Sequence, residues 1–130
     1  MTWTRVEARV GAGLPDINGA MKSGEFWIES KVISTKKFST VGLWRPSQVA
    51  WQFSRSKTFP NVWNLVSHPA SERLCLYSGT HILDLNDPDA PLVDPCLVMT
   101  YPVNWDAMIE YISGSLIKMN TSMDYERANV

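Results

Sequence analysis

The stretch that decides the fold is residues 13–33, GLPDINGAMKSGEFWIESKVI, which predicts a β-hairpin. Two runs with strand-forming residues flank Lys22-Ser23-Gly24, a strong turn signal. If the chain reverses at this turn, Asp16 lies opposite Glu29. Glu29 and Lys31 are two residues apart, so they project from the same face of the second strand. Local spacing alone therefore predicts a cluster of Asp16, Glu29 and Lys31.

The residue types in this cluster indicate phosphodiester chemistry. Two carboxylates close together repel each other unless a cation neutralises them, and oxygen ligands of this kind suit Mg²⁺ or Mn²⁺. A neighbouring lysine can orient or deprotonate an attacking water, or neutralise charge on a phosphate in the transition state. The alternative interpretation is a surface hairpin with an ordinary Glu-Lys ion pair and an aspartate in a turn.

Pro15-Asp16 and Glu29-Ser30-Lys31 resemble, in order and spacing, the signature of the PD-(D/E)xK nuclease superfamily. Arg5-Val6-Glu7 upstream, Trp27-Ile28 before the glutamate and LWRPSQVAW at residues 43–51 strengthen the resemblance. Together these pieces are similar to small phage-encoded nucleases of the VRR-Nuc and Holliday-junction-resolvase-like type. The resemblance covers roughly residues 5–78.

This resemblance implies roles for four residues of the hairpin. Asp16 and Glu29 would be metal ligands, and Lys31 would be the catalytic lysine. In the superfamily the main-chain carbonyl between the glutamate and the lysine often adds a ligand, which here belongs to Ser30.

Glu7 is the only carboxylate upstream of Asp16, and many members of the superfamily use an upstream glutamate as a further metal ligand. Its separation from Asp16 is shorter than in resolvases that carry a full helix there. A salt bridge with Arg5 or Arg9 is therefore an equal alternative for Glu7.

Residues 45–57 predict a helix. Pro46 suits its first position, where the missing N–H would be unpaired anyway. Apolar residues recur at helical spacing: Val49, Ala50 and Phe53. Because a helix start offers free N–H groups and a favourable dipole, we expect Arg45 and Gln48 to contact a DNA phosphate or the active site. For Gln48 the alternative is a polar side chain on a solvated helix end.

The net charge of −1 hides an uneven distribution. Residues 1–60 carry nine lysines and arginines against four acids, whereas residues 61–130 carry three against nine. The positive charge of residues 1–60 would attract a phosphate backbone. For any single lysine or arginine, the alternative is a solvated basic face with no partner. The residues that we expect to contact DNA are Arg5, Arg9, Lys36, Lys37, Arg45 and Gln48.

Length and composition predict one nuclease domain over residues 1–114, followed by an arm or tail over residues 115–130. No apolar run is long enough for a membrane span, and the N-terminus lacks an apolar signal core. We therefore expect no membrane partner and action in the cytoplasm, that of a bacterial host if the chain is phage-encoded as the resemblance implies. Cys75 and Cys96 are expected to be reduced thiols.

The expected fold is α/β, with a restriction-endonuclease-like core in which helices flank a central mixed β-sheet. The resemblance implies a metal site where the strands splay apart. Downstream strands are predicted over 61–67, 73–77, 81–83 and 96–101, an acidic loop over 84–95, and a helix over 105–112 capped by Asn104 and ended by Gly114.

These features predict a divalent-metal-dependent DNA endonuclease that hydrolyses phosphodiester bonds. The resemblance implies release of a 3′-hydroxyl and a 5′-phosphate, and cleavage of branched DNA such as a Holliday junction by a homodimer. The next interpretation is a general DNA endonuclease involved in genome degradation or packaging. One alternative is a catalytically silent nucleic-acid- or protein-binding module with a nuclease fold, and another is a small phage structural or host-takeover protein.

Overall fold

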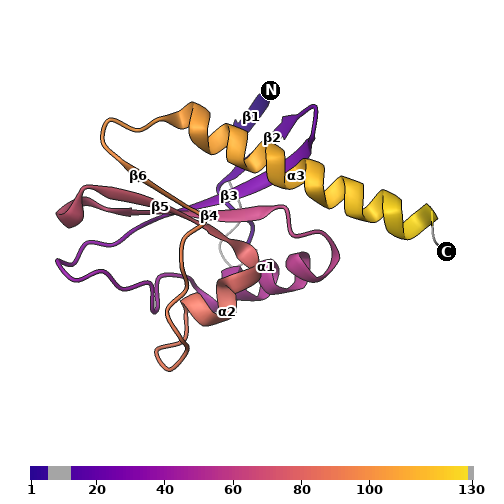
Figure 1. Ribbon diagram of the computed structural model, residues 1–130. Helices are drawn as coiled ribbons and strands as arrows, with labels where there is room; N and C mark the ends of the chain where they lie inside the picture. Colours follow the sequence, from indigo (N-terminus) through magenta and orange to yellow (C-terminus); the bar gives the residue numbers. More distant parts are fainter. Residues whose placement is uncertain (6–12, 129–130) are drawn as a thin grey trace.

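The structure, a computed structural model, describes residues 1–5 and 13–128 (Figure 1). Strands and α-helices follow one another along these residues, with two short 3-10 helices at Pro69–Ser71 and Gly79–His81. In chain order the strands and helices are β1 (Thr2–Arg5), β2 (Ile17–Met21), β3 (Gly24–Val32), α1 (Pro46–Thr58), β4 (Val62–His68), β5 (Arg73–Ser78), α2 (Ile82–Leu85), β6 (Leu97–Thr100) and α3 (Trp105–Ala128).

The strands form one sheet in the order β1-β2-β3-β4-β5-β6. β3 and β4 run parallel, and the other neighbouring strands are antiparallel. Parallel neighbours need a crossover connection, which here contains α1. Figure 1 shows α3 across one face of the sheet, with α1 and α2 on the opposite face. The expected α/β class is confirmed: a mixed sheet flanked by helices, consistent with a restriction-endonuclease-like core.

The β2–β3 hairpin has the predicted register. Ile17 pairs with Ile28 and Met21 pairs with Gly24, so the chain reverses at Lys22-Ser23. The ladder between the two strands ends at Ile17, and extending its register by one residue places Asp16 opposite Glu29.

One face of the sheet packs against α3. Phe26 and Ile28 of β3 point to this side and form a core with residues of the later strands and of α3: Trp63, Leu65, Leu74, Leu76, Met99, Met108, Ile112 and Leu116. Asn104 caps α3 as expected, since its Oδ1 accepts a hydrogen bond from Ala107 N over 3.2 Å.

The predicted end of this helix at Gly114 is wrong, because α3 continues to Ala128. Ile112 and Leu116 are fully buried on either side of Gly114. Their packing on the sheet outweighs the low helix propensity of glycine. The segment expected as an arm or tail therefore starts inside a continuous helix.

The opposite face carries a second core formed by β4, β5, α2 and the segment between β3 and α1. Its members are Ile33, Trp44, Val66, Cys75, Tyr77, Ile82 and Leu85. The predicted strand over 81–83 is wrong, since His81 ends a 3-10 helix and α2 follows at once. Ile82 and Leu85, one helical turn apart, are the residues that α2 buries on the sheet.

The face that α1 presents to the sheet is also different from the expected apolar one. Gln48 and Gln52 are its buried residues. Of the expected apolar residues, Val49 is half-buried and packs against the second core, whereas Ala50 is exposed and Phe53 is 40% exposed. Beneath α1 the sheet presents the polar residues Glu29 and Asn64, which amide side chains can pair with. Buried polar side chains on both the helix and the sheet, together with the half-buried Val49, therefore decide how α1 packs.

Candidate active site

The candidate site lies where β2 and β3 part. Just before β2 begins, Asp16 Oδ2 accepts a hydrogen bond from Ser30 N over 3.1 Å. Asp16 N donates to Glu29 Oε2 over 3.1 Å. At this point hydrogen bonds from main-chain N–H groups to side-chain carboxylates replace those between the main chains of the two strands. Asp16 and Glu29 therefore lie next to each other, as predicted.

The carbonyl of Ser30 faces the same opening. Trp27 N and Ile33 N donate to main-chain oxygens on the β4 side, so the odd-numbered residues of this stretch turn their peptide groups to β4. Those of Ser30 therefore point to the β2 side, where the register would place Pro15 opposite. Because proline has no N–H, Pro15 cannot donate to the carbonyl of Ser30.

Glu29 is the buried member of the carboxylate pair, with 2% of its surface exposed. Its Oε1 accepts a hydrogen bond from Gln48 Nε2 over 3.0 Å and lies 3.5 Å from Lys31 Nζ. Burial raises the pKa of Glu29 above its usual value of 4.5, and the charge of Asp16 raises it further, while Lys31 and the hydrogen bonds act in the opposite direction. Lys31 and the hydrogen bonds therefore only partly offset the effects of burial and of Asp16, which disfavour the ionised form of Glu29.

Lys31 and Gln48 complete the cluster. Lys31 Nζ donates to Gln48 Oε1 over 2.9 Å, and this same oxygen accepts from Arg45 N over 2.9 Å. Gln48 is the third residue of α1 and 4% exposed, so the alternative of a solvated helix end is wrong. The first turn of α1, which begins at Pro46 as predicted, is therefore tied to β3 through the site itself.

Gly13 explains how the loop before β2 reaches this position. Its φ is +75°, and a Cβ atom placed on it would lie 2.2 Å from Ser47 O. Only glycine allows the main chain to pass this close to the first turn of α1. The close passage fixes the start of the loop that carries Asp16 against α1.

Sequence reasoning missed a second set of polar residues behind the site. Gln52 and Asn64 exchange two hydrogen bonds, from Gln52 Nε2 to Asn64 Oδ1 over 2.7 Å and from Asn64 Nδ2 to Gln52 Oε1 over 2.8 Å. Trp44 Nε1 also donates to Asn64 Oδ1 over 2.9 Å. The available signal was the spacing of Gln48 and Gln52, four residues apart on one helix face.

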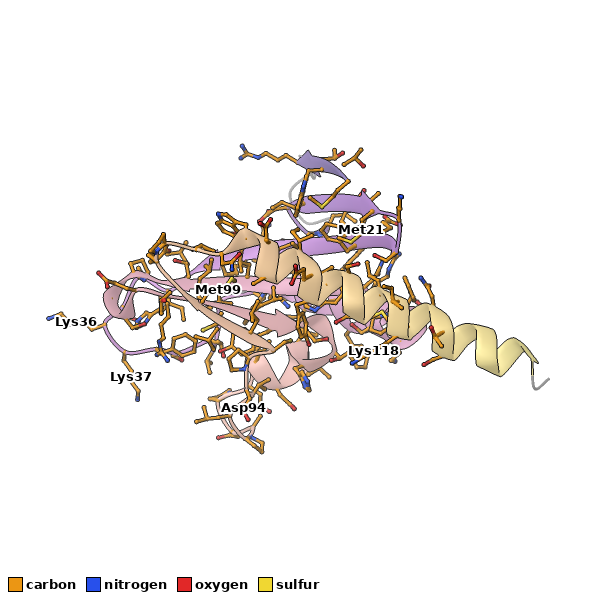
Figure 2. All side chains as sticks on the ribbon, turned by 45° about the horizontal axis from the view of Figure 1, so that its top comes forward. Met21, Lys36, Lys37, Asp94, Met99 and Lys118 are labelled. Atoms are coloured by element: carbon orange, nitrogen blue, oxygen red, sulfur yellow. The ribbon has the colours of Figure 1, made fainter. Side chains whose placement is uncertain are left out.

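The side chains of the other residues predicted to contact DNA are not gathered at the site; Arg45 reaches it only through its main-chain N–H. Arg5 is exposed in β1, Arg45 is exposed, and Lys36 and Lys37 are exposed in their loop, pointing away from the rest of the fold (Figure 2). Glu7 and Arg9 lie outside the described residues.

Residues 1–5 and 13–128 contain no group of three or more His, Cys, Asp or Glu side chains placed to share a metal ion. The candidate donor set therefore consists of two carboxylates, Asp16 and Glu29, with the main-chain carbonyl of Ser30. Over the same part of the chain, no helix combines the length and apolar character needed to cross a membrane.

Comparisons of the chain with protein-family models, with curated proteins and with solved structures found no match.

Proposed function

We propose that this protein is a divalent-metal-dependent DNA endonuclease of the PD-(D/E)xK type, which hydrolyses phosphodiester bonds. The observation that carries the proposal is the convergence of Asp16, Glu29, Lys31 and Gln48 at the opening between β2 and β3. Three separate segments of the chain supply these groups. An accidental Glu-x-Lys pair on a surface hairpin would not bury its glutamate beneath a helix start.

The donor set fits Mg²⁺ or Mn²⁺. Carboxylate and carbonyl oxygens are the hard ligands that these ions prefer, and the ions keep several waters in addition. Within the described part of the chain, Asp16 Oδ1 accepts no hydrogen bond, and Lys31 is the only cation that contacts the carboxylate pair. A divalent cation held by Asp16, Glu29 and the carbonyl of Ser30 would neutralise the remaining negative charge, and its chemistry is Lewis-acid polarisation of the scissile phosphate.

Lys31 performs the chain's own part of the reaction in this proposal. Its ammonium group is held between Gln48 Oε1 and Glu29 Oε1, which fixes it at the wall of the site. From there it orients the attacking water and stabilises the charge that develops on the phosphate. Gln48 positions Lys31 and donates to Glu29, so one amide fixes both charged groups.

The more specific form of the proposal is cleavage of branched DNA by a homodimer with two active sites, as the resemblance to resolvases suggests. The exposed side chains of Lys36, Lys37 and Arg45 add positive charge for a DNA backbone. Phage origin and action in the cytoplasm of the host belong to the same proposal.

The test is a substrate panel of supercoiled plasmid, four-way junction, flapped and linear DNA, together with RNA, incubated with Mg²⁺ or Mn²⁺. Wild-type protein is expected to nick DNA, and Asp16→Asn and Lys31→Ala are expected to be inactive. Asp84→Asn and Lys118→Ala are matched controls, because both residues are exposed, lie outside the cluster and are not among the expected DNA contacts. If wild type and variants are equally inert while DNA binding persists, the silent binding module is the correct function.

A further inference from the structure

A pair of tryptophans lies beside the candidate site. The rings of Trp27 and Trp51 meet edge to face, with their centroids 5.4 Å apart. Both side chains are half-buried. Neither residue takes part in the hydrogen bonds that connect the catalytic cluster.

The position of the pair follows from the elements that carry it. Trp27 lies two residues before Glu29 on β3 and therefore projects from the same face, roughly 7 Å along the strand. Trp51 lies three residues after Gln48 on α1, nearly one helical turn further on. The two tryptophans therefore lie next to the site, Trp27 along β3 and Trp51 along α1.

Trp51 also borders an open cavity of about 290 Å³, lined by Trp51, Ser54, Arg55 and Thr58. The guanidinium carbon of Arg55 lies 5.7 Å from the centroid of the Trp51 ring. Arg55 is held in place by a hydrogen bond from its Nε to Asn61 Oδ1 over 3.0 Å, and its Nη2 lies 3.9 Å from Glu25 Oε2. The cavity therefore combines an aromatic ring, an anchored cation and two hydroxyl-bearing residues.

The chemistry of this cavity favours a nucleobase over other occupants. Aromatic rings and guanidinium groups stack on any base, and a cation beside the ring suits the adjoining phosphate. Among the residues of α1 none is acidic, so the helix does not repel a phosphate. Trp27 does not line the cavity itself, but its edge-to-face contact holds the Trp51 ring in place from the side.

We infer that Trp51, with Trp27 and Arg55, forms a stacking site for an unpaired nucleobase next to the scissile phosphate. The bases of a duplex are covered on both faces by their neighbours, so an isolated ring and guanidinium receive a base only from a single-stranded segment. This inference rests on the proposed function and narrows it: the substrate class is DNA with a single-stranded flap, gap or end adjoining the cleavage point.

Binding is measured by fluorescence anisotropy with a labelled thymidine oligonucleotide, in EDTA, so that the result does not depend on cleavage. Trp51→Ala is expected to raise Kd about tenfold, the effect of losing one stacked base. Trp51→Phe should retain most of the affinity because it keeps an aromatic face. Phe53→Ala is the matched control: Phe53 is an exposed aromatic on another side of α1, beneath Lys57, and its loss should leave Kd unchanged.

A change on the DNA side removes any dependence on how the variants fold. Wild-type protein is titrated with oligonucleotides in which an abasic nucleotide occupies each position in turn. One position is expected to lose about tenfold in affinity, and this loss should disappear in Trp51→Ala and persist in Trp51→Phe. The same bases placed in a blunt duplex should show no dependence on Trp51.

An unchanged Kd at every abasic position would overturn the inference, as would equal losses for Trp51→Ala and Phe53→Ala. The two proposals fail separately. A protein that binds single strands through Trp51 but cleaves nothing contradicts the nuclease and supports the stacking site. A protein that cleaves DNA with no dependence on Trp51 contradicts the stacking site alone.

Discussion

Lys31 Nζ donates a hydrogen bond to Gln48 Oε1 over 2.9 Å, which joins the second strand of the hairpin to the first turn of α1. Through Nε2 the same amide donates to Glu29 Oε1, so Gln48 holds the lysine and the glutamate at once. Gln48 therefore has two roles: it connects the first turn of α1 to β3, and it positions the charged groups of Lys31 and Glu29.

Replacing Gln48 with alanine should impair both stability and activity. The change leaves Glu29 with one donor fewer in a buried site, and removes an acceptor from Lys31 and from Arg45 N. We expect a loss of about 1–3 kcal/mol in the free energy of unfolding, measured by urea titration, and a large loss of DNA nicking. Ala50→Gly, on the exposed side of the same helix, is a control for helix propensity alone and should retain nicking. Wild-type activity in Gln48→Ala would show that Lys31 needs no positioning.

Glu29→Gln should make the protein more stable at neutral pH while it abolishes activity. The pKa of Glu29 is raised in the folded state, chiefly by burial, so folding opposes its ionisation. Above pH 4.5 the unfolded chain loses the proton of Glu29 while the folded protein still keeps it. The free energy of unfolding of the wild type therefore falls as the pH rises from 4.5 to the folded-state pKa of Glu29, and stays at the lower value above it.

Glutamine cannot ionise, so Glu29→Gln does not show this fall in the free energy of unfolding. The gain in the urea midpoint of Glu29→Gln over wild type, measured without divalent cations, should therefore be present at neutral pH and absent below pH 4.5. A gain that stays constant across this range would contradict the assigned ionisation.

Gly13→Ala and Gly42→Ala separate backbone strain from close packing. Both glycines have a positive φ, +75° and +76°, but a Cβ atom at Gly13 would lie 2.2 Å from Ser47 O, whereas nothing lies within 4 Å of one at Gly42. Gly42→Ala should cost about 1–2 kcal/mol, the ordinary penalty of the left-handed region. Gly13→Ala should cost clearly more in urea titration and should also reduce nicking, because it displaces the loop that carries Asp16. Equal costs and equal activities would show that this loop does not position Asp16.

Asn64→Ala tests the polar pair behind the site. The change leaves the buried amide of Gln52 and the indole N–H of Trp44 without their shared partner. We expect a loss of about 2–4 kcal/mol in the free energy of unfolding. Gln52→Leu combined with Asn64→Leu removes both members of the amide pair and should recover part of that loss. No recovery in the double variant would show that α1 depends on this pair for more than hydrogen bonding.

The hairpin was predictable from the sequence because its determinants are local. The turn at Lys22-Ser23-Gly24 sets the register, and the register sets where Asp16, Glu29 and Lys31 lie. Pro46 likewise marks the start of α1 and so the place of Gln48.

The remaining features depend on partners that are distant in sequence. Which face of α1 is buried depends on Glu29 and Asn64 beneath it, which apolar periodicity does not report. α3 passes through Gly114 because Ile112 and Leu116 find a sheet to pack on. The helices at residues 79–85 are decided in the same way, by the burial of Ile82 and Leu85 in the second core.

The measurement that tests the central claim most directly is calorimetric titration of the protein with Mn²⁺. Wild-type protein is expected to bind the ion, Asp16→Asn and Glu29→Gln are expected to lose at least tenfold in affinity, and the exposed control Asp84→Asn should bind like wild type. Absence of Mn²⁺ binding by the wild type, or equal binding by Asp16→Asn and Glu29→Gln, would contradict a metal site between Asp16 and Glu29.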